Sequence, residues 1–202
     1  AAVHQHHLQL RSVWRDDADV IRIYTFLFLG ILLVYAVVTL LLPSFTTNAL
    51  FREQLEIRYG QGFSGSAIYG SFSPALFFSL LSNNFLVLMA CFVLALLTGD
   101  GAIFLITWNA SVWGTIFGLT AKNAASISGQ NPVLVFAIIM LVVFPHMILE
   151  AMSYFFAAIS GSVISKDVLL EEFASHRFFE VFGFNLYLLL FGLIVLVLGA
   201  GV

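Results

Sequence analysis

Long apolar stretches restrict the possible folds of this chain more than any other feature of its sequence. The hydrocarbon core of a bilayer is about 30 Å thick, and roughly 20 residues of α-helix cross it. Five stretches reach or approach that length, at residues 23–42, 75–97, 102–119, 132–164 and 182–202. Only 9% of the residues are charged, which is too few to cover a soluble globule. The sequence therefore predicts an all-α, polytopic integral membrane protein in which residues 1–202 form a single transmembrane domain.

The few charged side chains exclude one class of partner. The net charge of −3 arises from 8 basic and 11 acidic residues, and neither sign forms a run that could follow a phosphate backbone. We therefore expect no nucleic acid as a partner, but membrane lipids and other membrane or membrane-associated proteins. The one cysteine of the chain, Cys91, lies in an apolar stretch and is expected to pack in the core.

The stretch at 132–164 is too long for one straight crossing. As a continuous helix it would measure about 50 Å, well over the thickness of the hydrocarbon core. Pro145 lies inside it, and a proline removes one backbone donor and clashes with the preceding turn. The sequence therefore predicts a helix break at Pro145. Two arrangements fit this prediction, a kinked and steeply tilted helix or a re-entrant pair of half-helices.

The segments between the apolar stretches predict the connections. A Thr-Gly-Asp-Gly turn at 98–101 is short enough to make the two flanking helices antiparallel neighbours. The extramembrane excursion at 44–73 predicts a short surface helix in its first half and a Gly/Ser-rich loop in its second. Segment 166–180 alternates charged and apolar residues at roughly helical spacing, which indicates an amphipathic helix at the membrane interface.

The distribution of Lys and Arg predicts the orientation. With five crossings, one side holds Arg11, Arg15, Arg22, Lys166 and Arg177, while the other holds Arg52, Arg58 and Lys122. Because cytoplasmic segments carry an excess of basic residues, this count favours a cytoplasmic N-terminus. If 132–164 instead returns to the side from which it entered, Lys166 and Arg177 change sides and the count favours the opposite orientation.

Asparagines inside the apolar stretches are candidates for a polar intramembrane site. Asn83 and Asn84 lie in the second stretch, and Asn109 lies in the middle of the third. Uncharged polar side chains in a bilayer most often hydrogen-bond between helices, and otherwise line a polar cavity.

A histidine and a glutamate follow the expected break. His146 and Glu150 are four residues apart in FPHMILEAMSYFF and therefore share one helix face. The pair fits three roles: a structural or partner-facing pair, a proton- or ion-handling site, or part of a metal site. A catalytic metal needs a third protein ligand, and the apolar stretches offer no second acidic or His-bearing motif. We therefore predict no catalytic residues, no metal and no cofactor.

Small residues recur at helical spacing in two places. Ala110, Gly114 and Gly118 form one stripe, and Ala157 and Gly161 form another. Such stripes let a second helix approach closely. They serve either internal packing or an oligomer interface, and the internal interpretation is favoured.

Two segments resemble a known family. The strings are SNNFLVLMACFVLALLTGDGAIFLITWNASVWGTIFG and FPHMILEAMSYFFAAISG. The first is similar to the paired-asparagine helix, glycine turn and asparagine-bearing helix of the stage II sporulation protein M family. The second is similar to its Pro-His-Gly-x-x-Glu signature. The matched positions are Asn83, Asn84, Gly99, Gly101, Asn109, Gly114, Pro145, His146, Glu150, Ala158 and Gly161. The chain departs from the family at Met147, where Gly is usual, and at Met152, where Pro is common.

The resemblance implies a role in the prokaryotic cytoplasmic membrane. The sporulation member of that family is a polytopic subunit that anchors and coordinates peptidoglycan-remodelling enzymes. By resemblance we expect a non-enzymatic multispanning subunit that scaffolds or anchors partner proteins and can form a homo-oligomer. The alternative is a small channel or transporter whose midplane site comprises His146, Glu150 and the intramembrane asparagines.

Overall fold

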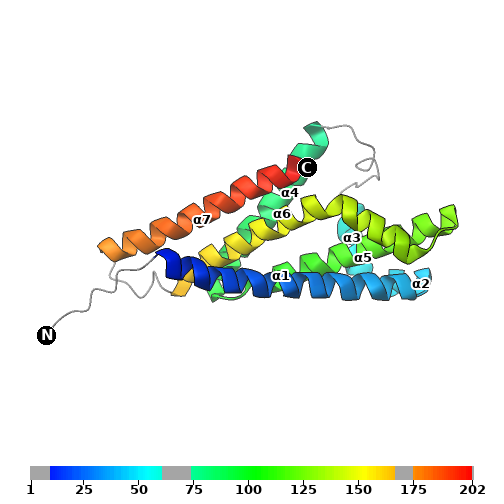
Figure 1. The fold of residues 1–202 in the computed structure, drawn as a ribbon, viewed down its shortest axis with the longest axis horizontal. Helices are drawn as coiled ribbons and strands as arrows, with labels where there is room; N and C mark the ends of the chain where they lie inside the picture. The colour runs from blue at the N-terminus through cyan, green and yellow to red at the C-terminus, as the bar shows by residue number, and fades with distance from the viewer. Residues whose placement is uncertain (1–9, 61–73, 167–174, 202) are drawn as a thin grey trace.

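Helices account for the regular structure of residues 10–60, 74–166 and 175–201, the part of the chain that the computed structural model describes. The long helices are α1 (Leu10–Leu41), α4 (Pro74–Thr98), α5 (Ala102–Ser128), α6 (Pro132–Lys166) and α7 (His176–Gly201). The short helices α2 (Ser44–Leu50) and α3 (Arg52–Gly60) follow α1 in the chain and precede α4, and α3 lies beside α5 (Figure 1). Each long helix contains a segment long and apolar enough to cross a membrane. The predicted all-α membrane fold is therefore confirmed.

Several helices extend beyond the apolar stretches that predicted them. α1 begins at Leu10 rather than at residue 23, and α5 continues to Ser128 rather than ending at 119. Residues 176–180, predicted as part of a separate interfacial helix, are the first residues of α7. Apolarity marks the lipid-facing part of a helix, whereas only an incompatible backbone ends it. The remainder of that segment at 167–174, and the Gly/Ser-rich loop at 61–73, lie outside the described residues.

Proline does not divide α6. The helix is continuous from Pro132 to Lys166 with Pro145 inside it, so Pro145 does not interrupt the helix and the re-entrant pair of half-helices is not formed. Figure 1 shows that α6 is bent along its length, which is the arrangement expected where a proline removes one backbone hydrogen bond. Of the two arrangements considered, the single kinked helix is the one present. The five long helices consequently alternate in direction.

The turn between α4 and α5 makes them antiparallel, as predicted. Gly99 adopts a positive φ of 81°, a backbone conformation that favours glycine. Each of the two helices nevertheless packs more extensively on another partner, α4 on α6 and α5 on α1. α7 covers the outer side of α6, so that α6 is the central helix of the bundle (Figure 1).

The small-residue stripes lie at helix crossings within the chain. A Cβ atom added to Gly114 would collide with the backbone carbonyl of Leu32, and one added to Gly118 would lie 2.9 Å from the carbonyl oxygen of Ala36. A Cβ atom on Gly161 would likewise collide with the α4 backbone. Ala110 and Ala157 are fully buried. The glycines therefore allow α1 to approach α5 and α4 to approach α6.

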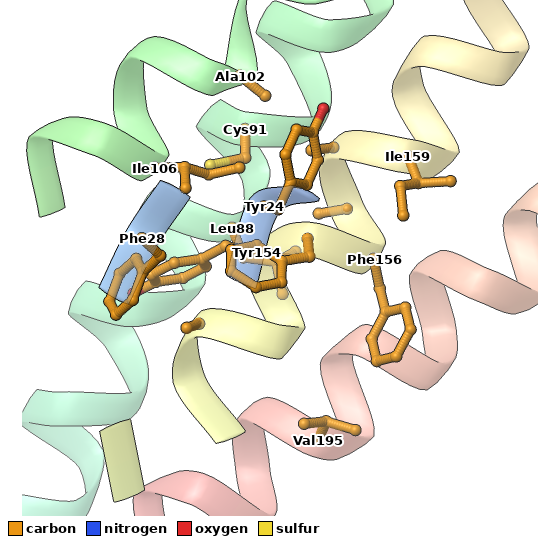
Figure 2. Packing of buried hydrophobic residues seen from close by; sticks show 14 of the residues in the cluster. Tyr24, Phe28, Leu88, Cys91, Ala102, Ile106, Tyr154, Phe156, Ile159 and Val195 are labelled. Carbon is orange, nitrogen blue, oxygen red and sulfur yellow. The ribbon is translucent and has the colours of Figure 1, made fainter. Parts of the chain in front are cut away.

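Large side chains fill the spaces between these crossings. Figure 2 shows Tyr24 and Phe28 of α1, Leu88 and Cys91 of α4, and Tyr154 of α6 converging on one core. Cys91 is fully buried there, as its sequence environment predicted. The same core lies directly beside the intramembrane polar residues.

α3 folds back along the bundle instead of projecting away from it. The Lys122 ammonium group donates a hydrogen bond to the carbonyl of Leu42, which aligns the end of α1 with that part of α5. From there α3 returns, and the buried Leu55 packs on a patch of α5 formed by Val112, Ile116 and Leu119. Val112 precedes Lys122 by ten residues, or about 15 Å of helix. The helix in the first half of the excursion is therefore present, but it lies against the spans.

Candidate functional site

Glu150 is a buried acid whose carboxylate is surrounded by donors. It lies in the second half of α6 and is only 4% exposed. Its Oε1 accepts a hydrogen bond of 2.7 Å from the Tyr154 hydroxyl, one turn further along α6. Its Oε2 accepts a bond of 2.7 Å from the Asn84 amide of α4, and lies 3.3 Å from Nε2 of His146. A buried carboxyl group needs hydrogen-bond partners, and both oxygens of Glu150 have one.

His146 links α6 to two other helices. Its Nδ1 lies 2.7 Å from the carbonyl oxygen of Gly199, in the last turn of α7. Its ring stacks on Trp113 of α5, with a centroid separation of 6.4 Å and an interplanar angle of 16°. The His146 side chain is 22% exposed, compared with 5% for the Glu150 side chain. The histidine is therefore the more accessible member of the pair.

Two consecutive asparagines approach the pair from α4. Asn83 donates a hydrogen bond of 3.2 Å to the side-chain oxygen of Asn84, which orients the Asn84 amide so that its nitrogen donates to Glu150. The His146/Glu150 pair and the α4 asparagines therefore meet in one place. We refer to Asn83, Asn84, His146, Glu150 and Tyr154 as the polar cluster.

The third candidate asparagine is bonded differently. The Asn109 amide donates to the carbonyl of Leu105 in its own helix, at 2.8 Å. Asn185 of α7 behaves in the same way and donates to Val181 at 2.8 Å. Sequence position could not distinguish these asparagines from Asn84, because a side-chain amide near a helix backbone has local and interhelical acceptors available.

The position of the cluster follows from local sequence. The four-residue spacing puts His146, Glu150 and Tyr154 on successive turns of one face of α6. Gly199 lets α7 lie close to that face, since a Cβ atom there would be 3.2 Å from the Leu149 Cβ and 3.6 Å from the Glu150 nitrogen. The sequence analysis did not identify Gly199 or Trp113 as neighbours of the site. The motif gave no indication that Gly199 would lie near the site, and an aromatic residue in an apolar helix carries no specific signal.

The chemistry available to the cluster is the binding and transfer of a proton. Carboxylate, imidazole, phenol and amide groups meet within hydrogen-bonding distance. Ser153 is also buried nearby, but its hydroxyl donates to the Glu150 backbone carbonyl at 2.6 Å. Within the described ranges, no three His, Cys, Asp or Glu residues gather as they would around a metal ion.

Comparison with known proteins identifies one family. The model of the family described as "Stage II sporulation protein M" matches residues 23–202, which include every helix named above except α1's first turns. Neither the curated proteins nor the solved structures contain a significant match to this chain.

Proposed function

The chain belongs to the stage II sporulation protein M family, and on that premise we propose that it is a non-enzymatic membrane subunit that anchors partner proteins. We place it in the cytoplasmic membrane of a prokaryote. Its partners would be other membrane or membrane-associated proteins, or a second copy of itself.

One observation carries this proposal: the buried carboxyl group of Glu150 is hydrogen-bonded from inside the helix bundle. Its donors are Asn84 of α4 and Tyr154 of α6, and its ionic partner is His146 of the same helix. Such a network fixes α4 against α6 and specifies one packing arrangement. A rigid multispanning platform of this kind is what an anchoring subunit requires.

The partner-binding surface would include α3. Its Arg52 and Glu56 side chains form an ion pair of 2.6 Å and are 74% and 56% exposed, while Leu55 anchors the helix to α5. Charged side chains held on a fixed helix can select a partner by charge complementarity. The segment at 166–180 would supply a second docking surface.

A second candidate function is transport, which the partial exposure of His146 favours. A histidine that reaches the surface beside a buried carboxylate is the arrangement expected for a proton or cation pathway. In this alternative the intramembrane asparagines would line the pathway.

Flux measurements separate the two functions. Purified protein in liposomes would be assayed for proton and monovalent-cation flux, with Glu150→Gln and His146→Ala as variants. The anchoring role predicts no flux above protein-free liposomes for any of the three proteins. Flux that is present in the wild type and lost in both variants would establish transport instead.

Site-specific crosslinking in the native cell tests the anchoring role directly. A photoreactive residue at Glu53, which is exposed on α3, should give one dominant protein adduct. The matched control is Leu86 on α4, 68% exposed, which we expect to face lipid and give no protein adduct. Equal and diffuse labelling at both positions would contradict α3 as a docking surface.

A further inference from the structure

We propose that His146 and Glu150 together bind one exchangeable proton, and that this proton allows the pair to hold the C-terminal turn of α7 against α6. The inference goes beyond the anchoring role, since it concerns a proton-binding site and applies whichever partner the protein holds.

The first step is the protonation of His146 Nδ1. This nitrogen lies 2.7 Å from the Gly199 carbonyl oxygen, and a carbonyl oxygen only accepts hydrogen bonds. The contact is therefore attractive only when Nδ1 carries a hydrogen and donates it. Gly199 belongs to the last described turn of α7.

The second step concerns the opposite nitrogen of the ring. Nε2 lies 3.3 Å from Oε2 of Glu150. With Nδ1 protonated, a neutral ring would present the Nε2 lone pair to a carboxylate oxygen, which is repulsive. The contact becomes attractive when one more proton lies on Nε2 or on Oε2. In either form the pair carries no net charge, which suits its buried position.

Loss of that proton to water removes one of the two contacts. A neutral imidazole has a single N–H, so it can donate to Gly199 or to Glu150 but not to both. Because the charged carboxylate is the stronger acceptor, the remaining N–H stays on Nε2 and α7 loses the bond to its last turn. The proton therefore couples the charge of the pair to the attachment of α7.

The surroundings favour retention of the proton. α5 presents the face of the Trp113 ring, and α7 presents the Gly199 carbonyl oxygen, both of which stabilise an imidazolium. α4 contributes the uncharged Asn84 amide and the Cys91 thiol, which lies near Tyr154. Tyr154 of α6 donates to Glu150.

Trp113 provides a direct readout, because a protonated imidazole quenches indole fluorescence more strongly than a neutral one. The chain has 3 tryptophans, and Trp14→Phe with Trp108→Phe leaves Trp113 alone. The full chain in liposomes would be titrated over about pH 5–10, the range in which an imidazole changes charge. We expect one transition in Trp113 fluorescence. Amide hydrogen exchange of residues 195–201, corrected for its intrinsic pH dependence, should accelerate through the same midpoint as the pH rises.

Variants make the test specific. Glu150→Gln should lower the proton affinity of His146 at least tenfold, which moves the midpoint down by a pH unit or more. Asn109→Ala, outside the cluster, should leave the midpoint unchanged. His146→Gln should abolish the transition, and if that variant does not fold, the comparison of wild type with Glu150→Gln still decides. An absent transition, a midpoint insensitive to Glu150→Gln, or exchange at the end of α7 that does not follow the fluorescence would overturn the proposal.

Discussion

At the scale of single residues, the site is governed by the cost of burying a carboxylate. Glu150 is 4% exposed, and an isolated charge at such a depth would be strongly destabilising. The Asn84 and Tyr154 donors offset that cost, and His146 supplies the opposing partial or full charge. We therefore expect the loss of stability on substitution to be larger for a side chain that contacts the carboxylate directly than for one that does not.

Asn84 and Asn109 form a matched pair for testing this ranking. Asn84→Ala removes a donor from a buried carboxylate and should lower the free energy of unfolding by about 1–2 kcal/mol. Asn109→Ala removes only a bond within α5 and should lower it by about 0.5 kcal/mol or less. Unfolding titrations with SDS in mixed micelles measure both. Equal losses would show that Asn84 contributes nothing through Glu150.

Lys122 is a second residue whose role depends on one contact. Its ammonium group donates to the carbonyl of Leu42, just after the end of α1, where a positive charge is favourable. Lys122→Met should lower the free energy of unfolding by about 0.5–1 kcal/mol, because the carbonyl loses this donor. Lys122→Arg keeps a donor and should retain most of the stability. A Lys122→Met protein as stable as the wild type in thermal unfolding would contradict the capping role.

At the scale of helices, glycine position decides how the elements pack. Gly114 meets the α1 backbone, whereas a Cβ atom added to Gly30 of α1 would meet no atom within 4 Å. Gly114→Ala should therefore lower the free energy of unfolding by about 1–3 kcal/mol through overpacking. Gly30→Ala should leave it unchanged or raise it by up to about 1 kcal/mol, since alanine favours helix. Destabilisation by Gly30→Ala would reveal a neighbour of α1 outside this chain.

Helix existence was predictable, but helix limits and continuity were not. Apolar length located all five long helices, because the bilayer fixes the number of residues needed to cross it. Apolar length could not locate the start of α1 or the end of α5, because polar residues extend a helix where no glycine or proline ends it. Pro145 shows the converse, because α6 continues as one helix through a residue that disfavours helix.

The candidate site was predictable only in part, for a reason visible in its members. The four-residue spacing correctly placed His146 and Glu150 on one face of α6. Gly199 comes from a helix remote in sequence, and its role is played by a backbone carbonyl that any residue possesses. Side-chain identity therefore carried no information about that contact.

At the scale of the whole molecule, five alternating helices put the α4–α5 turn and the α5–α6 turn on opposite faces. With the basic residues counted above, Asp100 should face the cytoplasm and Gln130 the exterior. In a Cys91→Ala background, Gln130→Cys should react with a membrane-impermeant maleimide on intact cells, and Asp100→Cys only after lysis. The reverse labelling pattern would invert the orientation, and labelling of both positions on intact cells would contradict the number of crossings.

Because α3 runs back along α5, the hydrophobic thickness of the protein differs between its α3 side and its α6 side. Along the first half of α6, Leu134, Ile138 and Leu141 are 54%, 51% and 78% exposed, close to the α5–α6 turn. On the α3 side, Arg52 and Glu56 are exposed on a helix that runs back toward the middle of α5. Lipid tails that match the α6 side are too long for the α3 side. We therefore expect the bilayer to thin locally next to α3, and other helices with a short hydrophobic length to gather at this step in membrane thickness.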